Sequence, residues 1–344
     1  MPQGSIADVE RRRTTRNIAV LVILGVLIII VLLISMNTGV IRLTPLEVIR
    51  TLLGQGTERH ELILFQFRMP RIVISLLIGA GLAVSGCVMQ GISRNALADP
   101  GILGINAGAG LMVMLYVSFF PTTSLGSIFL LPILALVGSG ATAALIFALS
   151  YKRGHGIAPT RLLLTGIAVA AGISSAMIVL TLRLEPQKYQ FVATWLAGSI
   201  WGTNWKFVAA LLPWTIILIP IIFIKAQVLN ILNLGDSTAT GLGAPVAKEQ
   251  IIMLAAAVGL AGSSVAVSGG IGFVGLIGPH LARRLVGPKH QVALPTAALT
   301  GALLVLTADM LGRWIMQPSE IPAGIVVAVI GAPYFLYLLA RSKS

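Results

Sequence analysis

Charged residues are scarce in this sequence. Asp, Glu, Lys and Arg make up 10% of the 344 residues, whereas soluble domains carry about 25%. Hydrophobic residues make up 56%, and the mean hydropathy is +0.95. Such a chain cannot cover a water-facing surface, so its composition excludes a soluble protein. Because a bilayer forces backbone groups to pair within each segment, we expect an all-α integral membrane protein.

The residues that most enzymes and pumps need are also missing. No Gly-Lys dipeptide occurs, which excludes the phosphate-binding G-x-x-x-x-G-K-[ST] loop. The single cysteine, Cys87, allows no intrachain disulfide, and the four histidines show no metal-ligand spacing. Carboxylates are absent from the middle of the apolar runs, where proton-driven transporters usually hold them. We therefore expect no ATPase or other enzyme activity, no bound metal and no cofactor in this chain.

The apolar runs predict about ten membrane-spanning helices, because a bilayer core needs about 20 apolar residues of helix. A tail over 1–17 precedes a single membrane domain over 18–341. The eighth span is short, and glycines blur its start. The predicted spans are 18–36, 72–92, 101–120, 127–150, 161–182, 206–224, 249–268, 273–287, 292–312 and 322–340.

The distribution of positive charge predicts the orientation. With the N-terminus inside, fifteen of the 24 Lys and Arg residues fall on the cytoplasmic side and nine outside. This excess agrees with the positive-inside rule and places both termini in the cytoplasm. The net charge of +13 lies in short gaps between apolar runs, not on one basic face. It therefore does not indicate nucleic-acid binding.

The first outer loop carries a helix signal of its own. Thr44 is a candidate N-cap, Pro45 suits the first helical position, Glu47 completes a capping box, and Gly54 is a stop. We expect a short helix at the outer surface. Its simplest role is to anchor the loop at the membrane interface.

Glycine is abundant, with 37 residues. Small residues allow helices in a membrane to approach closely, so dense packing is the simplest interpretation. The fifth span offers an alternative, because its small and hydroxyl residues could line a weakly polar path. These residues are Thr165, Gly166, Gly172, Ser174 and Ser175.

Several segments together resemble one family. They are FRMPR from Phe67, GAGLAVSGCVMQGISRNALADPGILG from Gly79, WLAGS from Trp195, LGDSTATGLG from Leu234, GGIGFVGLIGPHLARRLVGPKH from Gly269, and ADMLGRWIMQPSEIPAGIVVAVIGAPYFLYLL near the C-terminus. In this order, from about residue 40 onward, the chain is similar to the permeases of the iron-chelate and cobalamin ABC importers.

The resemblance implies the architecture of a type II ABC importer permease in the bacterial plasma membrane. A second permease subunit, identical or related, would lie beside this one in the lipid. Two cytoplasmic ATPase subunits would use ATP and Mg, and an extracytoplasmic binding protein would deliver the substrate. We expect a ferric siderophore as cargo, with haem or cobalamin as the alternative. A secondary transporter, working without an ATPase, is the alternative from another class.

The resemblance also implies a cytoplasmic coupling element between the sixth and seventh spans, in a loop at about 225–248. Local sequence supports a short helix there, because Gly235 and the residues after it can start one, and Gly241 or Gly243 can stop it. A solvated linker is the alternative. The ATPase-coupling residues are expected to be Leu234, Gly235, Asp236, Ser237, Thr238, Ala239, Thr240, Gly241, Leu242 and Gly243.

Two further sites follow from the resemblance. The inner gate of the family is an Asn-Pro-Leu turn, which reads Asn95-Ala96-Leu97 here. The arginines that dock the binding protein correspond to Arg68, Arg71 and Arg313. For Arg313 a competing interpretation exists, because Asp309 stands four residues earlier on the same helix and can pair with it.

Overall fold

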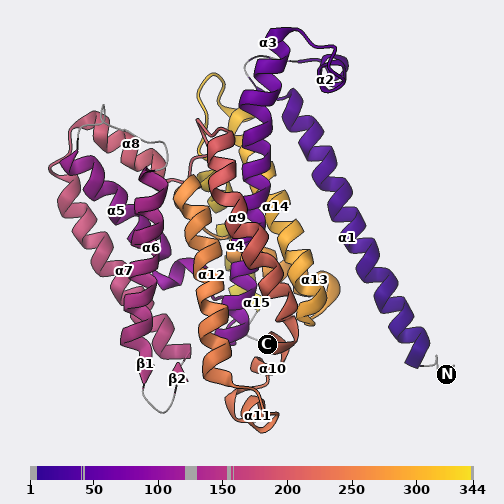
Figure 1. Cartoon of the computed structure of the whole chain (residues 1–344), viewed down its shortest axis with the longest axis vertical. Helices are drawn as coiled ribbons and strands as arrows, with labels where there is room; N and C mark the ends of the chain where they lie inside the picture. The colour runs from indigo at the N-terminus through magenta and orange to yellow at the C-terminus, as the bar shows by residue number, and fades with distance from the viewer. Residues whose placement is uncertain are drawn as a thin grey trace.

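The computed structural model describes residues 6–341 except 40, 42, 121–129, 153–155 and 158, and these residues are almost entirely helical (Figure 1). The first half of the chain contains α1 (Ile6–Asn37), α2 (Pro45–Leu52), α3 (Glu58–Glu61), the π-helix η1 (Leu62–Arg68), α4 (Met69–Ser93), the 3-10 helix η2 (Pro100–Leu103), α5 (Ile105–Phe119), α6 (Leu130–Ser150) and the paired strands β1 (Tyr151–Lys152) and β2 (Gly156–Ile157).

The second half of the chain continues with α7 (Pro159–Thr181), α8 (Pro186–Leu196), α9 (Trp205–Ile224), α10 (Ala226–Leu232), α11 (Asp236–Gly241), α12 (Val246–Ser268), α13 (Val274–Val286), α14 (His290–Ile315) and α15 (Ala323–Arg341). Nine of the ten predicted spans each overlap one helix, although residues 127–129 of the fourth span lie outside the described residues. The third predicted span, 101–120, includes most of η2 as well as α5.

Within the described residues, eight helices are long and apolar enough to cross a membrane. The two other predicted spans form shorter helices, α5 with 15 residues and α13 with 13. The prediction of a short eighth span is therefore confirmed. Its start is delayed because the glycine-rich stretch 269–272 is not helical, and Phe273 has a left-handed φ of 65°.

The positions of the two chain ends agree with ten predicted crossings, because an even number of crossings leaves both ends on one side of the membrane. Helix α1 begins and helix α15 ends at the same end of the bundle, and α11 lies at that end too (Figure 1). Helix α1 starts at Ile6, so much of the predicted tail is helical. At 1.5 Å per residue its 32 residues extend about 48 Å, more than the bilayer core needs. Its first turns therefore project beyond the membrane.

The predicted outer helix is present as α2. The Glu47 carboxylate accepts a 2.7 Å hydrogen bond from the Thr44 backbone N–H, and the Thr44 hydroxyl accepts one from the Glu47 backbone N–H. The bonds from the Thr44 backbone and hydroxyl hold the pKa of the Glu47 carboxyl below its ordinary value. The capping box and the stop near Gly54, which has a φ of 76°, are thus confirmed. Anchoring at the interface stays a prediction.

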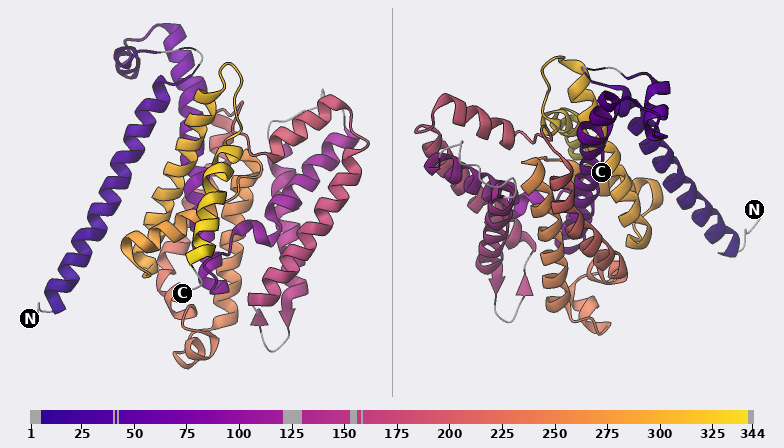
Figure 2. Two further views of the ribbon diagram at one scale, coloured as in Figure 1. Left: turned by 180° about the vertical axis from the view of Figure 1, so that it is seen from behind. Right: turned by 45° about the horizontal axis from the view of Figure 1, so that its top comes forward.

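Helix α4 lies in the middle of the bundle and packs against α12, α13 and α14 (Figure 2). Glycine allows this close packing at two positions along α4. A Cβ on Gly79 would lie 2.2 Å from the carbonyl oxygen of Gly301 in α14, and one on Gly86 would lie 1.9 Å from that of Gly275 in α13. Dense packing is therefore confirmed for these glycines.

Helices α5 to α8 form a second group at one side of the bundle (Figures 1 and 2). Within α7, Gly172 does not pack in the same way, although Gly166 is buried. Only 11% of the apolar window of α7 is buried, and nothing lies within 4 Å of the Cβ position of Gly172. The face of α7 is therefore largely uncovered in a single chain, and its possible role in lining a path stays a prediction.

We expect Gly86→Ala to destabilise the bundle, because the added methyl group would clash with a backbone carbonyl that cannot rotate away. Overpacking of this kind typically costs about 1–3 kcal/mol. The matched control is Gly25→Ala on α1, whose Cβ would meet nothing within 4 Å. Thermal unfolding in detergent, followed by size-exclusion chromatography, should show a lower transition temperature for Gly86→Ala only. Equal temperatures for both variants would contradict the packing argument.

Candidate functional site

A cluster of charged groups closes the outer end of the bundle, and Asp309 is at its centre. The Asp309 side chain is fully buried, and its carboxylate lies 2.8 Å from the Arg71 guanidinium and 3.2 Å from the Arg313 guanidinium. Arg71 also pairs with Glu320 at 2.8 Å. One carboxylate thus joins α4 to α14, and the loop after α14 contributes a second.

The same cluster ties down the end of α1. Arg313 donates hydrogen bonds to the Ser35 hydroxyl at 2.6 Å and to the Thr38 carbonyl at 3.0 Å. Arg68 is also buried, and its guanidinium donates to the carbonyls of Met36 and Ile41. Three elements that are far apart in the sequence are therefore held together at one end of the membrane.

The arginines predicted to dock a binding protein do lie together, but they are not three free cations. Each guanidinium of Arg68, Arg71 and Arg313 is directed toward acceptors of this same chain. The intrahelical pair of Asp309 and Arg313 is present, as the competing interpretation held. Docking of a binding protein at these three arginines stays a prediction.

At the opposite end, the predicted coupling segment 234–243 contains the short helix α11. It starts after Gly235, which has a φ of 102°, and its last residue is Gly241. The predicted start and stop are confirmed, and the segment is not an irregular linker. The cap differs, because Gly235 itself occupies the N-cap position without a side-chain bond. Apolar side chains flank the helix, with Leu234 61% and Leu242 62% exposed.

The loop that carries α11 is closed by an ion pair. Lys225, at the end of α9, lies 2.6 Å from Glu249 in the first turn of α12. Asn230 on α10 accepts a 3.0 Å hydrogen bond from the backbone N–H of His290, which starts α14. The predicted loop at about 225–248 is therefore a folded unit that rests on the transmembrane helices.

The predicted inner gate is the turn that follows α4. Arg94 ends the helix with a left-handed φ of 51°. The Asn95 side-chain carbonyl accepts a 2.9 Å hydrogen bond from the Leu97 backbone N–H, and the Asn95 backbone carbonyl accepts one from Ala98. This Asx turn stabilises the backbone where the family's turn has a proline after the asparagine. Whether Asn95, Ala96 and Leu97 form a gate stays a prediction.

Asp99 fixes the far side of this turn. Its carboxylate accepts a 2.8 Å hydrogen bond from the Gly101 backbone N–H, and its second oxygen lies 2.9 Å from the Cβ position of Gly275 on α13. Burial raises the pKa of the Asp99 carboxyl to about 6, although the Gly101 bond opposes this effect. The turn is therefore packed onto α13 at the Asp99 end.

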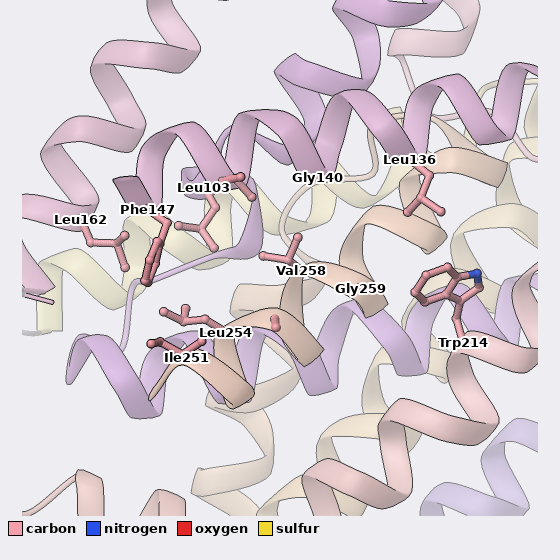
Figure 3. A pocket seen from close by; sticks show the side chains of 13 residues that line it. Leu103, Leu136, Gly140, Phe147, Leu162, Trp214, Ile251, Leu254, Val258 and Gly259 are labelled. Carbon is pink, nitrogen blue, oxygen red and sulfur yellow. The ribbon is translucent and has the colours of Figure 1, made fainter. Parts of the chain in front are cut away.

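An apolar cleft of about 420 Å³ separates α6 and α7 from α9 and α12 (Figure 3). Phe147 and Leu162 lie at one end and Trp214 at the other, with Val258 and Gly259 between them. The lining carries no charged group, and its one polar side-chain atom is the indole nitrogen. The cleft therefore offers no set of donors that could hold an iron chelate, which presents oxygen atoms and charge.

Metal ligands are likewise not grouped. Among the described residues, no three His, Cys, Asp or Glu side chains lie close enough together to bind a metal ion. Sequence reasoning missed the pairing of Arg71 with Asp309, which are 238 residues apart. It also missed the pairing of Arg94 with Asp236, 142 residues apart. The only available signal was that both members of each pair fall on the same predicted side of the membrane.

The sequence and the fold match proteins of known type. The family described as "FecCD transport family" matches residues 27–341. The iron(3+)-hydroxamate import system permease FhuG of Bacillus subtilis is 48% identical, over 97% of this chain and 100% of its own. The hemin transport system permease HmuU of Yersinia pestis is 39% identical, over 92% of this chain and 94% of its own. A solved inward-facing metal-chelate type ABC transporter has a TM-score of 0.82 and 32% identity, covering 94% of this chain and 99% of its own.

We expect Asp309→Ala to be strongly destabilising, because it leaves the Arg71 and Arg313 guanidinium groups near the outer surface without their shared carboxylate. Removing one partner of a buried ion pair typically costs about 3–5 kcal/mol. Glu320→Ala is the matched control. Glu320 has one arginine partner, and its side chain is 28% exposed, so the cost should be about 0–1 kcal/mol. Thermal unfolding of both variants in detergent measures the difference, and a silent Asp309→Ala would show that the cluster is not structural.

Proposed function

Since the chain belongs to the FecCD transport family and is the membrane-spanning permease subunit of an ABC importer, we propose that it carries a ferric siderophore across the bacterial plasma membrane. The observation that supports this substrate most is the near full-length match, at 48% identity, to a permease for iron(3+)-hydroxamates. A siderophore of the hydroxamate class is therefore our first choice. Haem is the second, since a hemin permease matches at 39%, and cobalamin the third.

The partner that supplies energy is proposed to dock at α11. This helix lies at the end of the bundle where the chain begins and ends, which the charge distribution places in the cytoplasm (Figure 1). Leu234 and Leu242 are large apolar side chains exposed to water there. Such side chains favour burial against another protein, here one of two ATPase subunits. These subunits would bind ATP and Mg, and this chain would bind neither.

A second permease subunit is proposed to cover α7, the most exposed long helix of the second helix group. The binding protein is proposed to dock at the outer end, around Arg68, Arg71 and Arg313. Because these arginines already have acceptors in this chain, an acidic partner would have to share Arg71 with Glu320, whose carboxylate is partly exposed. A secondary transporter would need no such ATPase, which gives a direct way to separate the two functions.

Leu242→Glu should abolish ATPase association, because it places a charge where we expect an apolar contact. Leu53→Glu, on the exposed end of α2 at the outer side, is the matched control. Affinity purification from membranes should recover a stoichiometric ATPase with the unsubstituted chain and with Leu53→Glu, and at least about tenfold less with Leu242→Glu. If no ATPase accompanies the unsubstituted chain, the importer assignment fails. If Leu242→Glu retains it, only the docking site fails.

Substrate choice should follow the binding protein, because the described helices offer no convergent polar groups for a chelate. In proteoliposomes with the complete importer, we expect ATP-dependent uptake of a ferric hydroxamate and no uptake of haem or cobalamin. The isolated permease should not bind the chelate tightly by equilibrium dialysis. Uptake of haem with its own binding protein, but not of the hydroxamate, would overturn the proposed substrate. A tight chelate site on the permease alone would contradict the argument about specificity.

A further inference from the structure

The coupling helix and the inner turn are joined by one ion pair. The Arg94 guanidinium donates a hydrogen bond to the Asp236 carboxylate, linking the last turn of α4 to the first residue of α11. Gln250 on α12 also donates to this carboxylate, at 3.4 Å. Among the residues that the structure describes, no other ion pair connects α11 with the turn at 94–99.

A left-handed residue lies at Arg94, and another residue with positive φ directly precedes Asp236. Arg94 has a φ of 51°, so its side chain leaves the chain at the point where α4 ends and the Asn95 turn begins. Gly235 has a φ of 102°, and its Cβ position lies 3.7 Å from the Arg94 guanidinium. The Arg94 side chain therefore lies in van der Waals range of the start of α11, and the positive φ at residue 235 favours glycine there.

The pair contributes little to stability. The Arg94 side chain is 33% exposed and the Asp236 side chain 44%, and solvent-exposed pairs of this kind add little to the free energy of unfolding. A displacement of α11, however, reaches the turn directly through this ion pair. The other end of the turn stays in place, because Asp99 lies against α13 there. The turn is therefore held at two points, one on a transmembrane helix and one on the coupling helix.

We propose that Arg94 and Asp236 are positioning residues for transport, forming the link through which movement of α11 sets the conformation of the Asn95-Ala96-Leu97 turn. The inference rests on the proposed function, in which an ATPase subunit binds α11. When the ATPase moves α11, the ion pair carries the end of α4 and the adjoining turn with it. Without the pair, ATP hydrolysis continues while the turn no longer follows.

The test uses neutral substitutions and a charge exchange in the complete importer. Arg94→Asn suits the left-handed backbone, because asparagine tolerates this conformation. Asp236→Asn keeps the shape of its side chain. Arg94→Asp combined with Asp236→Arg restores a pair of opposite charges. Lys248→Asn, an exposed cation near α11 with no ion pair in the described structure, is the matched control. Chelate uptake per ATP hydrolysed and the yield of co-purified ATPase are both measured in proteoliposomes.

We expect each neutral substitution to lower uptake per ATP by about fivefold or more, a usual size for coupling between sites. ATPase yield should not change, and the charge exchange should recover most of the loss. Lys248→Asn should behave like the unsubstituted chain. The inference is overturned if both neutral variants keep their uptake per ATP, or if the exchanged pair is as poor as the single variants.

A second measurement tests the link between Arg94 and the turn independently of the proposed transport function. With Cys87→Ser as background, Ala96→Cys in the full-length permease without partners is labelled with a water-soluble maleimide. Arg94→Asn should change the labelling rate by about fivefold or more, and Lys248→Asn should not. Equal rates overturn the link even if transport is ATP-driven. Lack of ATP-driven uptake by the unsubstituted complex contradicts the proposed function, and the labelling result then still decides whether Arg94 holds the turn.

Discussion

Helix α4 can pass through the middle of this bundle only because glycine removes side chains where backbones meet. In a bilayer, apolar helices gain almost no hydrophobic free energy by leaving lipid, so their association depends on close van der Waals packing. Gly79 meets Gly301 on α14, and Gly86 meets Gly275 on α13, at distances that exclude any Cβ. The middle of α4 is thus fixed to the middle of α14 and to the first turn of α13, and these contacts position the groups at the ends of α4.

The two ends of α4 carry different kinds of polar contact. At the outer end Arg71 shares the buried carboxylate of Asp309 with Arg313, and breaking such a pair leaves an uncompensated charge. At the inner end Arg94 meets Asp236 in a half-exposed pair that water can replace at little cost. The outer end of α4 is therefore held by a buried ion-pair cluster, and its cytoplasmic end by a pair that can break at little cost. An importer that is driven from the cytoplasm needs movement at the inner end most.

Features determined by local sequence could be predicted, and features determined by distant pairing could not. Hydropathy located ten spans, the Thr44 capping box located α2, and glycines bounded α11, since each signal lies within a few residues. The start of α1 was missed because hydropathy reports the apolar core and not the helix that continues beyond it. The contacts that Arg68 and Arg71 make, and those of Arg313 with α1, were not predicted because these acceptors come from other elements, brought near only by the fold. The pair of Arg313 with Asp309 could be foreseen, because both residues lie on α14 four positions apart.

The apolar character of the cleft bears on the proposal that the permease does not itself select the chelate. A chelate bound tightly within the membrane would have to be released again, and strong binding would slow that release. The cleft between α6 and α12 is apolar. The exposed residues of α7 are mostly large apolar or small ones, and its exposed charge, Arg161, lies at the start of the helix. Such surfaces neither attract a hydrophilic chelate nor retain it. These surfaces agree with the proposal that a partner outside the membrane recognises the chelate.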